Sequence, residues 1–199
     1  MKAAEIRARL AVPWRHGDCV DFAGIVCEDR LDLTGLSLTG ADFTGARFPH
    51  GIVALGARFP GVSWFRNAVI EEAADFTQAC FFNDARFEGT CFRAPAGFSR
   101  AEFRGTGSFD DCRLEAGADF SGAVSYGNFS IARMEADAPL TFRKAEWLGG
   151  LWCAGARLPV SADFAGTEVH GRLWLRDARR GGEALRPDAF GMPFGYIYA

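Results

Sequence analysis

The segment from Leu31 to Phe48 reads LDLTGLSLTGADFTGARF and carries a large apolar residue at every fifth position from Leu33 onward. The spacing continues in steps of five and six residues as far as Leu175. The positions reached from Phe43 onward, here termed the core positions, are Phe43, Phe48, Ala54, Phe59, Phe65, Ile70, Phe76, Phe81, Phe87, Phe92, Phe98, Phe103, Phe109, Leu114, Phe120, Ser125, Ile131, Ala136, Phe142, Trp147, Cys153, Leu158, Phe164, Val169 and Leu175. Such self-similarity indicates a repeat architecture and explains why this chain of 199 residues contains 19 phenylalanines.

Alanine forms a second regularity, because it commonly stands two residues before a core position, as at Ala41, Ala46 and Ala57. Residues two apart lie on the same face of an extended strand. Each unit is therefore expected to send one large and one small side chain inward and the residue between them outward. Glycine often follows two residues after a core position, as at Gly45 and Gly56, which suits a corner that needs a positive φ.

These units resemble the repeats of the pentapeptide-repeat proteins, whose consensus is A(D/N)LXX with Leu or Phe at the centre. Later units such as GADFSGA look like the Phe-centred branch of that family. The resemblance covers roughly Leu31 to Arg176 and implies an all-β fold, a right-handed quadrilateral β-helix with four short sides per coil. Steps of five, six, five and six residues make a coil of 22 residues, so we expect about six to seven coils. One interior ladder should contain Phe76, Phe98, Phe120, Phe142 and Phe164.

One core position breaks the volume pattern. Three of the four small core residues have a large residue two positions earlier, which conserves the volume of the interior. Ser125 is the exception, because Ala123 before it is also small. We expect a void there or an intrusion by Trp147, and we interpret the irregularity as packing, with a ligand pocket as the alternative.

The two ends of the chain depart from the repeat, so we divide the sequence into an N-terminal cap (1–30), the β-helix (31–176) and a C-terminal tail (177–199). Lys2 to Val12 suits a short helix with Ala3, Ile6 and Leu10 on one face, ended by Pro13. In the tail the inward slot would fall on Arg180, which predicts that the tail is not another coil but a cap or a dimerisation segment.

An aromatic face offers one candidate contact surface. Trp152 and Trp174 precede core positions and are one coil apart in the sequence, so they should stack on the same outer face. We expect the apolar tail either to fold back over this face or to be buried with it between two chains. Gyrase-targeting members of the resembling family dimerise through their carboxyl ends. The candidate interaction residues are Trp64, Trp152, Trp174, Phe190, Phe194, Tyr196 and Tyr198.

Acidic residues offer a second candidate surface, because family members that inhibit or protect DNA gyrase mimic B-form DNA in shape and charge. Outward acidic residues are expected in two columns, Glu102, Glu146 and Glu168 on one side and Asp75, Asp119 and Asp163 on another. Arginines such as Arg47, Arg86 and Arg113 occupy equivalent outward positions, so the rod is of mixed charge. A mixed surface is what solubility alone requires.

The sequence contains no catalytic, metal-binding or cofactor-binding signature. His50 and His170 fall at corners, and six cysteines without a CxxC pair predict free thiols, with Cys19 and Cys27 the one pair left open. A formal charge of −3 implies no direct contact with nucleic acid, and no segment predicts a membrane span or a signal peptide. We therefore expect a cytoplasmic protein.

Three hypotheses about function follow. The first is a non-enzymatic scaffold or protein-interaction module, with a homodimer through the C-terminal end as one form of contact. The alternative is a DNA-mimicking binder of DNA gyrase that gives inhibition or drug protection. The remote alternative is an enzyme with a pocket near Ser125 or under the tail.

Overall fold

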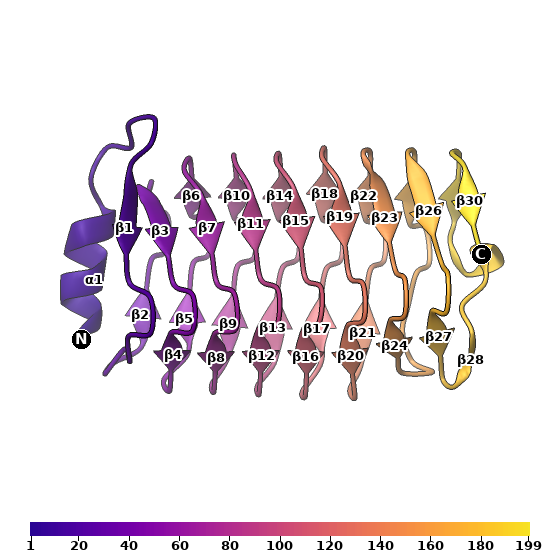
Figure 1. Ribbon diagram of the computed structural model, residues 1–199, viewed down its shortest axis with the longest axis horizontal. Helices are drawn as coiled ribbons and strands as arrows, with labels where there is room; N and C mark the ends of the chain where they lie inside the picture. Colours follow the sequence, from indigo (N-terminus) through magenta and orange to yellow (C-terminus); the bar gives the residue numbers. More distant parts are fainter.

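The protein is a straight rod of stacked coils (Figure 1). The computed structural model describes residues 1–199, and the chain winds into a β-solenoid of about 8 turns with one short helix, α1 (Ala3–Leu10), at its N-terminal end. The four sides of each coil are short strands that pair in parallel with the coils before and after them. This agrees with the β-helix that the resemblance to pentapeptide-repeat proteins implies.

Four sheets run along the rod, and we name them A to D in the order in which the chain visits them. Sheet A contains β1 (Cys19–Asp21), β3 (Gly40–Asp42), β7 (Ser63–Trp64), β11 (Ala85–Arg86), β15 (Gly107–Ser108), β19 (Phe129–Ser130), β23 (Gly150–Trp152), β26 (Arg172–Trp174) and β30 (Ile197–Tyr198). Sheet B contains β4 (Arg47–Phe48), β8 (Val69–Ile70), β12 (Cys91–Phe92), β16 (Arg113–Leu114), β20 (Glu135–Ala136), β24 (Arg157–Leu158), β27 (Arg179–Arg180) and β28 (Glu183–Ala184). Sheet C contains β2 (Leu31–Asp32), β5 (Ile52–Val53), β9 (Ala74–Asp75), β13 (Ala96–Gly97), β17 (Ala118–Asp119) and β21 (Leu140–Thr141). Sheet D contains β6 (Arg58–Phe59), β10 (Cys80–Phe81), β14 (Glu102–Phe103), β18 (Val124–Ser125), β22 (Glu146–Trp147), β25 (Glu168–Val169) and β29 (Met192–Pro193).

The expected number of coils, six to seven, was too low, because both ends of the chain add to the solenoid. At the N-terminal end, β1 pairs in parallel with β3, as in Cys19↔Gly40. At the C-terminal end, β29 and β30 join sheets D and A in parallel, as in Glu168↔Met192 and Leu173↔Ile197. The prediction that the tail adds no coil was therefore wrong in part, since two of its segments continue the parallel sheets.

The core positions line the interior. Every one of them is buried, and so are the alanines that stand two residues earlier. The expected phenylalanine ladder is present, because Phe98 stacks on Phe76 with ring centroids 5.1 Å apart and on Phe120 at 4.9 Å. Phe142 continues the ladder at 5.1 Å from Phe120 and 5.1 Å from Phe164.

The irregularity at Ser125 is filled by a neighbouring aromatic side chain. Ser125 pairs with Trp147 on the next coil, and both residues are fully buried. The side chain that replaces the missing ring is Phe129 of β19, which lies 5.1 Å from the Phe103 ring and 4.3 Å from Trp147. Gly107 makes room for it, because a Cβ atom there would lie 2.7 Å from the Phe129 ring. The interruption is thus a packing solution that involves Phe129, which the sequence analysis did not identify, as well as Trp147.

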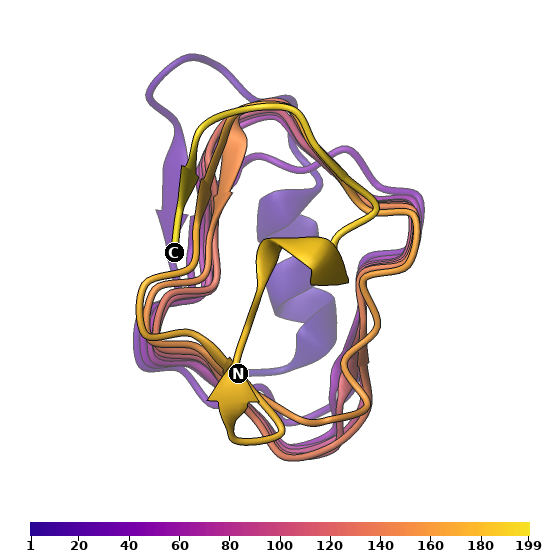
Figure 2. The ribbon, with the colours of Figure 1, turned by 90° about the vertical axis from the view of Figure 1, so that its right-hand side faces the viewer.

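Both ends of the interior are closed (Figure 2). At the N-terminal end, α1 buries Ala3, Ile6 and Leu10, the apolar face that its sequence predicted. At the C-terminal end a 3-10 helix, η1 (Pro187–Ala189), crosses the interior, and Leu185 and Phe190 beside it are buried. The Phe190 ring lies 4.7 Å from Phe164, the last ring of the ladder. These caps cover the apolar interior, which open coils would leave in contact with water.

Candidate functional site

The structure brings part of the predicted aromatic surface together on sheet A. Trp152 and Trp174 lie in register on neighbouring strands, as their spacing of one coil predicted. Tyr198 follows Trp174 on the next strand, and the two rings stack with centroids 4.5 Å apart. The tail therefore does not fold back over the tryptophans but extends their sheet by one strand, so that the aromatic column grows to three rings.

Two predicted residues of this surface lie elsewhere. Trp64 is on β7, several coils away, where its ring contacts Arg66 at 5.0 Å. Phe190 is only 4% exposed, because it closes the end of the core, so it is not available to a partner.

The last coil carries most of the exposed apolar surface of this end. Tyr196 is 78% exposed and Phe194 is 56% exposed, and Met192, Ile197 and Tyr198 are also exposed. No further strand pairs with the outer edges of β29 and β30. We call Trp152, Trp174, Met192, Phe194, Tyr196, Ile197 and Tyr198 the C-terminal aromatic end. Met192 and Ile197 belong to the same apolar tail but were not among the candidate interaction residues, because the last coil is longer than the others and its register does not follow from the repeat.

The acidic residues stand in the two expected columns, and every carboxylate except that of Glu146 contacts another group of the chain. On sheet C, the carboxylates of Asp75 and Asp119 accept hydrogen bonds from the backbone N–H groups of Thr77 and Ser121, at 2.9 and 2.7 Å. The carboxylate of Asp163, which bridges to Thr141 of the same sheet, accepts one from the Ala165 N–H at 2.8 Å. Such Asx turns fix the corners of the coils.

On sheet D the acidic column is interrupted and partly neutralised. Glu102, Glu146 and Glu168 occupy β14, β22 and β25, with Val124 on the strand between the first two. Glu102 pairs with Arg104 at 3.0 Å, and Glu168 lies 3.1 Å from the His170 ring. The column is therefore not a continuous run of free negative charge.

The acidic corners predict a loss of stability in acid. The backbone N–H of Ala165 and the guanidinium of Arg143 hold the pKa of Asp163 below its usual value, and the guanidinium of Arg133 does the same for the pKa of Asp111. A carboxyl whose pKa is lower in the folded than in the unfolded chain stabilises the fold above the unfolded pKa, and this contribution is lost as the pH falls through the folded pKa. We expect the free energy of unfolding in urea to be flat near neutral pH and to fall below about pH 4. Asp163→Asn should make this fall shallower, and an unchanged free energy down to about pH 2 would contradict the role of these corners.

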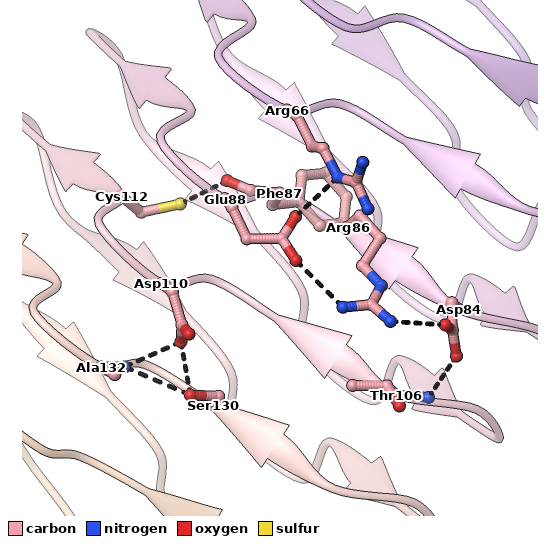
Figure 3. Close-up of polar contacts among 10 residues, drawn as sticks. All are labelled: Arg66, Asp84, Arg86, Phe87, Glu88, Thr106, Asp110, Cys112, Ser130 and Ala132. Atoms are coloured by element: carbon pink, nitrogen blue, oxygen red, sulfur yellow. Dashed lines mark hydrogen bonds and ion pairs between the residues drawn. The ribbon is translucent and has the colours of Figure 1, made fainter.

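A cluster of paired charges lies beside sheet A (Figure 3). Arg86 bridges two carboxylates, at 2.7 Å from Asp84 and 3.2 Å from Glu88, and Glu88 also lies 3.5 Å from Arg66. Burial would raise the pKa of Asp84, but hydrogen bonds from Arg86 and from the Thr106 N–H lower it overall. The charges of this cluster are thus matched, and the cluster joins successive coils.

The remaining polar groups of the cluster are structural as well. Asp110 accepts hydrogen bonds from the Ser130 hydroxyl and from the Ala132 N–H. The buried thiol of Cys112 donates to the carbonyl of Phe87 at 2.8 Å, as the hydroxyl of Thr90 donates to that of Phe65 one coil earlier. Burial raises the pKa of Cys112 well above its usual value, so the sulfur remains a protonated donor and not a nucleophile.

The six cysteines are free thiols, including Cys19 and Cys27, the pair that the sequence left open. No group of three or more His, Cys, Asp or Glu side chains is arranged to hold a metal ion. The single α-helix is too short and too polar to cross a membrane. Five surface grooves are open to solvent, and Ser125 lines none of these five.

Comparison with known proteins agrees with the geometry of the coils. Residues 54–101 match the family described as pentapeptide repeats (9 copies). No curated protein matches the chain. The matched segment lies within the regular coils, and the same parallel register from coil to coil continues beyond it as far as β26. The chain is a pentapeptide-repeat protein.

Proposed function

We propose that this repeat scaffold acts without catalysis and binds other proteins through its C-terminal aromatic end, with a second copy of the chain as one partner. The observation that carries the proposal is the last coil, where five large apolar residues are at least 40% exposed beside two unpaired strand edges. Apolar surface of this kind is characteristic of protein contacts, and unpaired strand edges favour the addition of further strands.

The charges at this end support a symmetric contact. Arg186 directly precedes η1 and Asp188 lies within it; both are exposed and form no ion pair within the chain. In a dimer with twofold symmetry the same patch faces itself, so that each of these residues can pair with the opposite charge of the other copy. Self-complementary charge around an apolar centre is the arrangement that such interfaces use.

The mass of the protein in solution tests this proposal. We expect light scattering to give about twice the chain mass of 21.6 kDa for the wild type. Ile197→Asp places a charge at the exposed end of the core and should give the mass of one chain. The matched control is Leu55→Asp, since Leu55 is also exposed at 39% but lies in an early coil, and it should leave the mass unchanged. A single-chain mass for the wild type at high concentration would overturn the dimer.

DNA mimicry is the alternative function, and the intrachain contacts of five of the six carboxylates in the two acidic columns weigh against it. It is tested by titration of the protein into a DNA gyrase supercoiling assay, with and without a fluoroquinolone. The scaffold proposal expects no inhibition and no protection from the drug. Inhibition that is abolished when Glu102, Glu146 and Glu168 are replaced by Lys would instead favour mimicry.

A further inference from the structure

A column of glycines runs along the corner where sheet D turns into sheet A. A Cβ atom at Gly105 would lie 2.7 Å from the backbone of Asn83, and one at Gly171 would lie 2.5 Å from that of Gly149. The coils are therefore too close for a side chain at these glycines. The members of the column are Gly61, Gly105, Gly127, Gly149, Gly171 and Gly195, interrupted by Asn83.

At the N-terminal end of the rod, an aromatic side chain of the same chain covers this column of glycines. The loop between α1 and β1 stands at the same edge of the rod (Figure 1), and its Trp14 packs on Gly61. The indole Nε1 atom lies 2.6 Å from the position that a Cβ atom of Gly61 would take, and it donates to the carbonyl of Asp18 at 3.3 Å. The corner thus accepts an indole against glycine, with the ring N–H directed at a backbone carbonyl of the same loop.

At the C-terminal end of the rod, the same column of glycines lines an open groove. Gly149, Gly171 and Gly195 form its base, and Trp152, His170 and Tyr196 stand around it. The carbonyl groups of Gly149 and Gly171 accept no hydrogen bond within the chain, and each lies against the next glycine of the column. The carbonyl group of Gly195 accepts no hydrogen bond within the chain either, and no later coil covers it.

The charge of this groove defines its partner further. Arg172 lines the groove, is exposed, and has no acidic partner, whereas the ring of His170 lies beside Glu168 at 3.1 Å. An unpaired guanidinium next to an aromatic ring suits a ligand that carries both a carboxylate and an aromatic group.

We infer that this groove binds a tryptophan together with a neighbouring carboxylate, presented by an acidic turn of a partner protein. The indole would lie on Gly171 and Gly195 against Tyr196, its N–H would donate to a glycine carbonyl, and the carboxylate would pair with Arg172. The inference rests on the proposed function in that it assigns a partner chemistry to one side of the C-terminal aromatic end.

The probe for this inference is N-acetyl-tryptophan, titrated into the ¹⁵N-labelled full chain. We expect saturable shifts of the Gly149, Gly171 and Tyr196 amides. N-acetyl-tryptophanamide, which lacks the carboxylate, and N-acetyl-phenylalanine, which lacks the N–H donor, should both bind more weakly. Tyr196→Ala and Arg172→Gln should each weaken the binding of N-acetyl-tryptophan by about two- to tenfold. The matched control is Tyr126→Ala, because Tyr126 is exposed at 52% outside the groove and its loss should have no effect.

Three results would overturn the inference: no saturable shift at the groove, shifts that do not respond to Tyr196→Ala or Arg172→Gln, or a stronger response to N-acetylglucosamine, which would indicate a saccharide site. The titration is repeated in Ile197→Asp, the variant expected to be monomeric. If the wild type binds the probe but never dimerises, the homodimer proposal is wrong and the groove proposal stands. If the wild type dimerises but the monomeric Ile197→Asp variant does not bind the probe, the groove proposal is wrong and the homodimer proposal stands.

Discussion

Phe98→Asp should unfold the protein. Phe98 is fully buried, with its ring stacked between Phe76 and Phe120 and in edge contact with Phe109 at 5.0 Å. The substitution removes the aromatic packing, a loss of about 3–5 kcal/mol, and adds the cost of a buried carboxylate without a partner. The sum is comparable to the whole stability of a typical domain, about 5–15 kcal/mol.

The control for this prediction lies two residues away. Arg100 is exposed at a corner with a φ of 55°, a left-handed conformation that Asp tolerates better than most residues. Arg100→Asp should therefore change the free energy of unfolding by about 0.5 kcal/mol or less. Circular dichroism during urea unfolding measures both variants, and equal tolerance of the two substitutions would refute the assignment of inward and outward positions.

The second large effect concerns Phe129 and Ser125. Phe129→Ala should cost about 3–5 kcal/mol, because it empties the space between Phe103 and Trp147 that Ser125 leaves. Ser125→Phe should cost about 1–3 kcal/mol on its own, because the new ring meets Phe129 in a full core. In the double variant the ring lies on β18, at the position that corresponds to Phe103 on β14 of the preceding coil. We expect this variant to recover most of the stability that each single substitution loses.

A double-mutant cycle of unfolding free energies measures this compensation. The matched control combines Ser125→Phe with Phe164→Ala, a buried ring in a later coil, and the costs of these two changes should add. Additive costs for Ser125→Phe and Phe129→Ala would show that the two residues do not share one space, which would contradict the packing described here.

The interior of the rod could be predicted because its rule is local. A coil closes only when its large side chains point inward, so steps of five and six residues between Phe65, Ile70 and Phe76 fix both the face and the sheet of each strand. The inward position of the Phe129 ring, which replaces the ring missing at Ser125, could not be predicted in the same way. It breaks the rule of one small and one large residue, and its reason lies in Gly107 and Ser125 on neighbouring strands.

The ends were harder to predict, because tertiary closure decides them. The last coil is longer than the repeat allows, since the chain turns back in the antiparallel pair of β27 and β28 before it crosses the interior. This detour turns Phe190 inward and leaves Tyr196 outward, although both belong to one aromatic tail. The pairing of Trp152 with Trp174 was predicted correctly, because both residues lie before the antiparallel pair of β27 and β28.

For the acidic columns, the sequence predicted where the residues lie but not which groups their carboxylates contact. The spacing placed Asp75, Asp119 and Asp163 on one side of the rod, and sheet C contains or borders all three. An Asp followed two residues later by a free backbone N–H is also the signature of an Asx turn, which indicates a corner rather than a ligand surface. The spacing gives the side of the rod on which each Asp lies, but only the backbone geometry of the corners shows that these N–H groups are free to donate to the carboxylates.

Amide hydrogen exchange of the last coil tests the central claim, that the C-terminal aromatic end is the contact surface of this rod. Exchange of the backbone amides from Met192 to Tyr198 is compared at protein concentrations below and above the dimerisation range found by light scattering. The account predicts that these amides become protected as the concentration rises, while those of the coil around Leu55 do not change. Protection confined to the acidic columns, or exchange at β29 and β30 that is independent of concentration, would contradict it.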